Sequence, residues 1–180
     1  MSLLCLRNPQ RARRIDLRLL RQIVLFILKE VFQEPRFELG IRLVSADEMA
    51  KINETFLQHV GSTDVVTFDY SQNAADTLAA EKFQAHSEVG PPTEGRQHVL
   101  HGEIFISIDD AVAQAKQFRA IWQSELARYV VHGLLHLRGF DDLNPAARRK
   151  MKREENRVLN LLSHRFPLNK LQRQPKSKNG

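Results

Sequence analysis

Two histidines four residues apart, followed by a glycine and an acidic residue, form the segment of this chain with the clearest chemical potential. His132 and His136 fall in HGLLHLRGFDD, with Gly139 three residues after the second histidine and Asp142 three residues further on. On a helix, the two imidazoles lie about one turn apart on the same face. Glycine permits the left-handed conformation that ends a helix and turns the chain back. The pattern predicts a metal site formed by His132, His136 and Asp142, with one coordination position left for water.

Other interpretations of this segment stay open at the level of the sequence. A histidine pair on a helix is by itself a weak signal, and Asp142 can instead cap the following helix and leave the metal site degenerate. Gly133 costs a helix about 1 kcal/mol relative to alanine, so a close approach of another segment would explain it. The metzincin protease signature has a glutamate directly after its first histidine as general base. Gly133 occupies that position, which disfavours peptide hydrolysis.

Hydrophobic periodicity predicts the elements that must position this segment. Helical spacing marks residues 16–31, 45–56, 109–118, 124–137 and 145–162, and strand-like patterns mark residues 3–6, 37–44, 63–68 and 98–108. Strands separated by helices, with helices crowding the C-terminal half, predict an α+β fold. We expect one domain, in which a small mixed β-sheet packs against several α-helices. The metal site then lies on a helix of the C-terminal half and the turn after it.

Two polar stretches interrupt this pattern. Residues 71–97 contain few apolar residues and include Gly90, Pro91, Pro92 and Gly95, which predicts a long loop between strands. Residues 167–180 are basic and have little apolar content, which predicts a disordered tail. The predicted folded domain is therefore residues 1–166.

Composition narrows the function classes. The chain has 27 Lys and Arg against 21 Asp and Glu, a net charge of +6 that favours polyanionic partners. It contains one cysteine and lacks the order of features of a secretory signal. The longest apolar run, residues 23–28, is far shorter than the roughly 20 residues that a membrane span needs. We expect a cytoplasmic protein with no membrane partner, whose oligomeric state the sequence does not reveal.

HGLLHLRGFDD resembles the H-G-x-L-H-L-x-G-[YF]-D-H signature of YbeY proteins, bacterial endoribonucleases of ribosomal RNA maturation. Further matches occur in the same order along the chain. Residues 52–53 and 62–68 resemble the family's L-N and P-T-D-V-L-S-F block, and residues 101–107 resemble its L-G-D-I-x-I-S strand. The resemblance extends from about residue 37 to residue 162.

The resemblance implies a metal-dependent endoribonuclease that acts on ribosomal RNA precursors or a ribosomal subunit and uses one zinc ion. The family's third metal ligand is a histidine, and Asp142 occupies that position. A carboxylate is an acceptable zinc ligand, and oxygen ligation also makes manganese or magnesium suitable. The family often carries an arginine where this chain has Leu57. Arg119, Arg128 and Arg138 are possible substitutes, and the sequence does not select among them.

Glu103 matches the acidic residue of the family's G-D-I strand. It is the predicted catalytic residue, as a general base or a partner of a metal ligand, although an ion pair at the end of a strand explains it equally well. Arginines and lysines between residues 148 and 157 form either a solvated helix face or a surface that contacts phosphates. The alternative function is a non-catalytic RNA-binding factor for ribosome assembly, with a structural or degenerate metal site.

Overall fold

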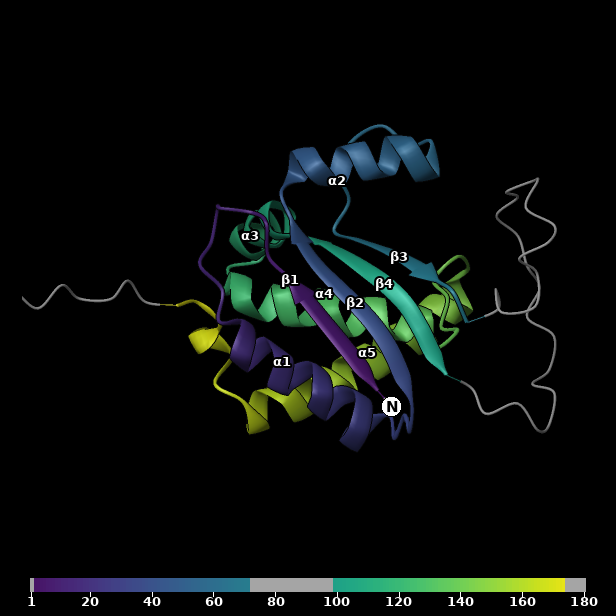
Figure 1. The fold of residues 1–180 in the computed structure, drawn as a ribbon. Helices are drawn as coiled ribbons and strands as arrows, with labels where there is room; N and C mark the ends of the chain where they lie inside the picture. Colours follow the sequence, from purple (N-terminus) through teal and green to yellow (C-terminus); the bar gives the residue numbers. More distant parts are fainter. Residues whose placement is uncertain (1, 72–98, 174–180) are drawn as a thin grey trace, which may run out of the picture.

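The computed structural model describes residues 2–71 and 99–173. Figure 1 shows the arrangement of the elements along the chain. The strands are β1 (Leu3–Arg7), β2 (Phe37–Val44), β3 (Val65–Asp69) and β4 (Leu100–Ser107). The α-helices are α1 (Leu17–Phe26), α2 (Ala46–Ile52), α3 (Ile108–Gln117), α4 (Trp122–Leu137) and α5 (Pro145–Arg165). Short π-helical segments, η1 (Ile27–Val31) and η2 (Asn53–Leu57), extend α1 and α2, and a 3₁₀ turn, η3 (Leu168–Leu171), follows α5.

The four described strands form one mixed sheet in the order β1-β2-β4-β3. The pairs β1–β2 and β2–β4 are parallel, with Leu3 beside Glu38 and Phe37 beside Leu100. β3 runs antiparallel to β4, with Val65 beside Ile106. The predicted α+β class with a small mixed sheet is confirmed, and its helices are those expected from the sequence.

The two faces of the sheet are covered to different extents. Helices α1, α4 and α5 pack on one face (Figure 1), where alternate strand residues such as Leu39, Ile41 and Ile104 are buried with the apolar sides of the helices. On the other face α2 forms a smaller apolar cluster, in which Met49 and Phe105 are buried. The alternation along each strand therefore assigns one set of side chains to the main core and the other set to a partly open surface.

Helix α4 lies unusually close to the sheet at Gly133. A Cβ atom at this position would lie 2.7 Å from Cγ2 of Ile104 and 3.3 Å from Cγ1 of Val65. The predicted burial of the face that carries Leu126, Val130 and Leu134 is confirmed, since all three are fully buried. The close approach anticipated from Gly133 is therefore a contact with β4 and β3, and it compensates for the helix propensity that glycine loses.

Side-chain caps account for where several helices begin. Asp16 accepts hydrogen bonds from the backbone N–H groups of Arg18 and Leu19, as expected at the start of α1. The cap of α3 differs from the expected Asp109: it is Ser107, whose hydroxyl accepts from the N–H of Asp110. Asp109 lies inside the helix, and its carboxylate accepts a hydrogen bond from the N–H of Ala46, at the start of α2. The structure thus uses Asp109 for a long-range contact.

The prediction of a disordered tail from residue 167 is wrong for its first seven residues. η3 places Leu171 fully inside the core, and its carbonyl accepts a hydrogen bond of 2.8 Å from the N–H of Asp16. The N–H of Arg173 likewise donates to the carbonyl of Arg14. Local composition hides this docking because a single leucine and two backbone bonds suffice for it. Residues 174–180, and the predicted loop at 71–97 apart from Ser71, lie outside the described residues.

Among residues 2–71 and 99–173, no helix combines the length and the apolar character that crossing a membrane requires.

Replacing Gly133 by alanine should destabilise the protein. The added methyl group overpacks the contact with Ile104, which costs about 1–3 kcal/mol, whereas the gain in helix propensity returns about 1 kcal/mol. Urea unfolding of Gly133→Ala, Ile104→Ala and the double variant measures the coupling. We expect Gly133→Ala to cost less when Ile104 is already truncated. Equal costs in both backgrounds would show that the close packing at Gly133 is not the source of the destabilisation.

Candidate metal centre

The two histidines lie on successive turns of α4 and face each other. Their Nε2 atoms are 3.1 Å apart, and their rings meet edge to face with centroids separated by 4.6 Å. Both side chains are half-buried, because the opposite face of α4 is fixed against the sheet. The helix backbone therefore determines the separation of the two nitrogen atoms.

A glycine turn brings the third side chain to this pair. Gly139 has φ +79°, and the N–H groups of Gly139 and Phe140 donate to the carbonyls of His136 and Leu135 at the end of α4. After this turn, the carboxylate of Asp142 returns to the two histidines. One ligand atom from each of His132, His136 and Asp142 lies within 4.8 Å of the others. The structure thus brings together the three residues that the sequence predicted as metal ligands.

The neighbours of Asp142 perform the other local tasks of this turn. Asn144 caps α5, since its side chain accepts from the N–H groups of Ala146 and Ala147. Asp141 accepts a hydrogen bond from the N–H of Leu143. The alternative interpretation of Asp142, as the cap of the following helix, is therefore wrong. Its carboxylate is left for the histidine pair.

The hydrogen bonds of the Nδ1 atoms determine which histidine nitrogens face the cluster as acceptors. Nδ1 of His136 lies 3.1 Å from the carbonyl oxygen of Phe140, and Nδ1 of His132 lies 3.1 Å from Oε2 of Glu155. Both partners only accept hydrogen bonds, so each Nδ1 carries the proton and each Nε2 of a neutral ring presents a lone pair. Orientation of a metal-binding histidine by a carbonyl or carboxylate is the arrangement found at protein metal sites.

The electrostatics favour a neutral His136. Burial lowers the pKa of this imidazole, and the neighbouring His132 lowers it further, against the opposing effect of Asp142. Two neutral imidazoles with facing lone pairs repel each other unless a cation or a proton lies between them. The donor set of two nitrogens and one carboxylate oxygen suits a zinc ion. The residues present therefore fit a metal ion.

Glu155 anchors the cluster to a wider ionic network. Its carboxylate is 3% exposed and accepts hydrogen bonds from Arg128 (2.6 Å) and Lys152 (2.9 Å), in addition to its contact with His132. Burial alone raises the pKa of Glu155, but the hydrogen bonds from His132, Lys152 and Arg128 together outweigh it and lower the pKa to about 2. Glu155 is therefore an anion throughout the physiological pH range.

A pocket of about 220 Å³ opens beside this network. His132 and Asp142 line it together with the cationic side chains of Arg128, Arg148 and Lys152. Arg148 also donates two hydrogen bonds, of 3.2 and 3.1 Å, to the carbonyl oxygen of Asp142, which anchors the turn that carries this residue. The pocket thus combines a candidate metal cluster with positive charge, an arrangement suited to an anionic substrate.

Comparisons with known proteins agree with this site. The family model described as "Endoribonuclease YbeY" matches residues 6–163. The chain belongs to the YbeY family. Its relatives named Endoribonuclease YbeY include that of Salinibacter ruber, 33% identical over 122 residues (68% of each chain). The relative from Phocaeicola vulgatus is 32% identical over 126 residues, which is 70% of this chain and 74% of the relative. The resemblance found in the motif is therefore confirmed.

A solved structure supports the fold of this YbeY-family member. The solution structure of TM1509 from Thermotoga maritima superposes with a TM-score of 0.59 at 20% sequence identity. It covers 98% of this chain, and the match spans 99% of that protein. At this identity the similarity supports the α+β architecture alone.

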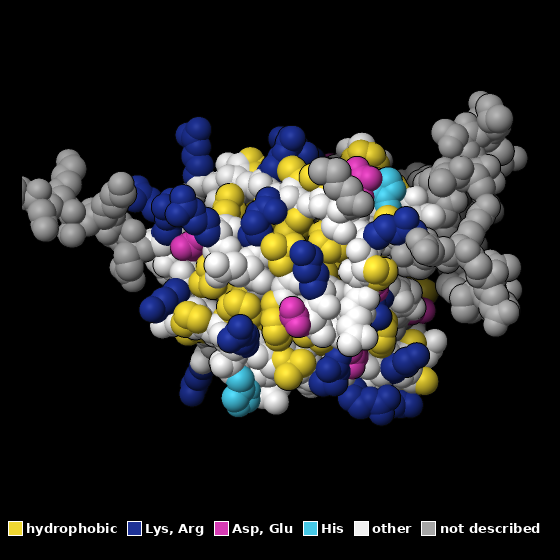
Figure 2. Space-filling model, turned by 60° about the horizontal axis from the view of Figure 1, so that its bottom comes forward, with side chains coloured by type: hydrophobic (Ala, Val, Ile, Leu, Met, Phe, Trp, Pro, Cys, Tyr) yellow, Lys and Arg dark blue, Asp and Glu magenta, His cyan; other side chains and the backbone are white. Residues whose placement is uncertain are grey.

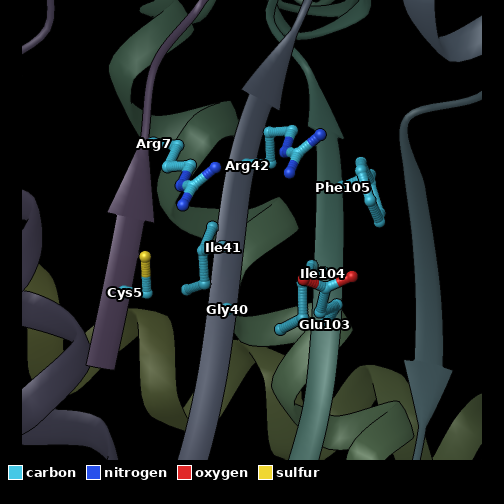
Figure 3. Close-up of a pocket in the computed structure, with 8 residues that line it drawn as sticks. All are labelled: Cys5, Arg7, Gly40, Ile41, Arg42, Glu103, Ile104 and Phe105. Atoms are coloured by element: carbon cyan, nitrogen blue, oxygen red, sulfur yellow. The ribbon is translucent and has the colours of Figure 1, made fainter. Parts of the chain in front are cut away.

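The structure does not bring Glu103 to the metal cluster. Within β4, Gly102 and Ile104 face α4, so the side chain of Glu103 lies on the opposite face of the sheet, beside Gly40 and Arg42 (Figure 3). Its predicted role as a general base or ligand partner at this site is therefore wrong. The strand alternation decides this, because neighbouring residues of a strand point to opposite faces. The carboxylates that line the pocket beside His132 are instead Asp64, Glu125, Asp142 and Glu155.

The position that often carries arginine in the YbeY family also differs here. Leu57 ends η2 and is 44% exposed, and the residue after it, Gln58, adopts a left-handed conformation with φ 55°. Of the three suggested substitutes, Arg128 lines the pocket. Arg138 is paired with Glu34 at 2.9 Å and stacks on Phe32. Arg119 is exposed beyond the end of α3.

Sequence reasoning missed the role of Glu155. A signal was present, because Met151, Glu155, Val158 and Leu162 follow each other at helical spacing and form the buried face of α5. A carboxylate on an otherwise apolar face indicates a buried partner, since an isolated buried charge is unfavourable. Only the packing of α5 against α4 identifies that partner as His132.

Glu155→Gln should weaken metal binding about 10- to 100-fold, because the amide replaces the carboxylate that orients His132. Competition with a chromophoric chelator at pH 7 measures the zinc affinity. Glu154→Gln is the matched control, since Glu154 pairs with Arg157 on the surface of α5. Equal affinities of the two variants would contradict the role of Glu155.

The same variant tests the charge of Glu155 in the metal-free protein. The folded state lowers the pKa of Glu155 from 4.5 to about 2, so its ionisation stabilises the fold. That stabilisation is complete above pH 4.5 and is lost as the pH falls towards 2. The difference in unfolding free energy between wild type and Glu155→Gln, measured in urea, should therefore shrink across this range. A constant difference would contradict the assigned pKa.

Proposed function

We propose that this protein is a metal-dependent endoribonuclease that cleaves ribosomal RNA precursors, with His132, His136 and Asp142 as ligands of a zinc ion. The observation that carries the proposal is the convergence of these three side chains within 4.8 Å in a chain of the YbeY family. When bound, the ion supplies positive charge and Lewis acidity beside a scissile phosphate. Manganese and magnesium are alternative ions, because Asp142 contributes an oxygen ligand.

The protein's own residues prepare the site for this ion. The hydrogen bonds from the Nδ1 atoms hold both imidazoles in the orientation that presents Nε2. Glu155 balances positive charge from Arg128 and Lys152, and this ionic network joins α5 to α4. Arg148 holds the backbone of Asp142 in place. The site is thus organised by contacts that exist before any substrate binds.

The charges around the pocket support an RNA substrate. Arg128, Arg148 and Lys152 lie on the same side as the cluster and are suited to contacts with phosphate oxygens. The face of the molecule that carries α1 and α5 also presents many Lys and Arg side chains, with fewer Asp and Glu among them (Figure 2). A polyanion approaching this site meets positive potential from both. A cytoplasmic location remains the prediction made from the sequence.

Metal content and RNA cleavage test this function together. We expect near-stoichiometric zinc in the purified wild type by elemental mass spectrometry, and cleavage of a precursor ribosomal RNA that a chelator abolishes. Asp142→Asn and His136→Ala should lose both the metal and at least 100-fold of the cleavage rate, because they remove ligands. Asp141→Asn is the matched control, since Asp141 serves only a local turn among the contacts described.

Two results would contradict the proposal. A wild type that binds RNA but cleaves none in the presence of zinc, manganese or magnesium would favour a non-catalytic assembly factor. Equal metal contents of Asp142→Asn and Asp141→Asn would remove Asp142 from the ligand set. Cleavage of unrelated RNA at the same rate as the ribosomal precursor would disprove the proposed substrate while leaving the nuclease in place.

A further inference from the structure

A second pocket, of about 280 Å³, lies on the open face of the sheet, away from the metal cluster. Strands β1, β2 and β4 form its floor and sides. The side chains that define it are Cys5, Arg7, Gly40, Arg42, Glu103 and Phe105 (Figure 3). None of these residues lines the pocket that contains His132.

Strand register arranges these side chains in two rows across the sheet. Cys5 pairs with Gly40 and Gly40 with Glu103, which forms the first row. Arg7 pairs with Arg42 and Arg42 with Phe105, which forms the second row one step along the strands. Residues paired in this way point to the same face of the sheet. The arginine row and the carboxylate row therefore lie two residues apart.

The arginine row is the unusual feature of this surface. Like charges directly opposite each other in a sheet destabilise it, yet Arg7 and Arg42 are direct neighbours. Among the described residues, the ion pairs include neither of them. In Figure 3 the guanidinium of Arg7 extends from β1 towards β2, and that of Arg42 extends towards β4. Two guanidinium groups on one side of a pocket match the oxygen atoms of a phosphate.

The rest of the pocket has the size and chemistry for a sugar or base. Gly40 leaves the floor open, since a Cβ there would lie 3.1 Å from Cγ of Glu103. Phe105 presents an aromatic ring beneath the guanidinium of Arg42, at 5.3 Å from its centroid. The carboxylate of Glu103 lies in the neighbouring row, where it accepts hydrogen bonds from hydroxyl or amino groups. Positive charge, an open floor and an acceptor therefore occur in the order phosphate, ribose and base require.

We propose that this pocket binds one nucleotide unit of the RNA substrate, with its phosphate on Arg7 and Arg42 and its sugar or base over Gly40 beside Glu103. The inference rests on the proposed function in taking RNA as the substrate. It adds a contact on the face of the sheet opposite the metal cluster, so that an RNA strand passes around the β3 edge to reach both. Arg7 and Arg42 thereby take over phosphate binding that Leu57 cannot provide.

Fluorescence anisotropy of a labelled single-stranded RNA, measured with metal-free protein in chelator, tests the contact without cleavage. Arg7→Gln/Arg42→Gln should weaken binding about tenfold or more, the effect of losing charge-assisted hydrogen bonds. The slope of log affinity against log salt should fall by about 1.4, which is about 0.7 for each lost phosphate contact on a single strand. Arg18→Gln/Lys29→Gln removes the same charge from exposed positions of α1 and η1 and should leave the slope unchanged. Equal losses in the two double variants would overturn the proposal.

Cys5 provides an independent reporter, because it is the single cysteine of the chain, is exposed and lines the pocket. Saturating RNA should slow alkylation of Cys5 in the wild type, and the same RNA concentration should protect it less in Arg7→Gln/Arg42→Gln. Protection by inorganic phosphate but not by RNA would assign the pocket to a free anion and overturn the proposal. Alkylation at the same rate with and without bound RNA would also overturn it.

These outcomes are separate from those that test the proposed function. RNA binding that depends on Arg7 and Arg42, in a protein that cleaves no RNA when loaded with metal, would disprove the nuclease and leave the pocket standing. Cleavage at the metal cluster without protection of Cys5 would do the reverse.

Discussion

The contact between Gly133 and Ile104 is the constraint on which the rest of the site depends. It allows α4 to approach β3 and β4 more closely than any residue with a Cβ atom would permit without a shift of its neighbours. A helix held this closely has little freedom to rotate, because Leu126, Val130 and Leu134 are locked into the core on the same side. His132 and His136 therefore share one face whose direction the sheet determines. The chemistry of the site depends on this packing, since both nitrogen ligands are carried by α4.

Charge organisation adds a second layer to this packing. A carboxylate as buried as that of Glu155 is unfavourable alone, and here it is balanced by two cations and a histidine N–H. The network joins α5 to α4 and presents His132 in the tautomer suited to metal binding. On the next turn, a backbone carbonyl performs the same task for His136. Two different acceptors thus prepare two equivalent nitrogens.

The sheet separates two chemical environments. Its inner face supports the helix that carries the candidate metal ligands, whereas its outer face is covered by α2 at one end and presents Arg7, Arg42 and Glu103 in a pocket. Residues adjacent in the sequence of β4 therefore serve different surfaces. A resemblance that aligns Glu103 with an acidic position of the YbeY family identifies its strand correctly, but it does not reveal which face the carboxylate occupies.

The sequence by itself determined the local elements and the ligand set. The strand at 37–44 and the cap at Asp16 follow from alternation and hydrogen-bonding capacity within a few residues, and His132, His136 and Asp142 follow from helical spacing and a glycine turn. Only the tertiary structure decided three other points. It placed Glu103 on the opposite face of the sheet, assigned Glu155 to His132, and docked Leu171 in the core beside α1. Each joins or separates segments distant in the sequence, and periodicity within one segment carries no information about which partner the folded chain brings to it.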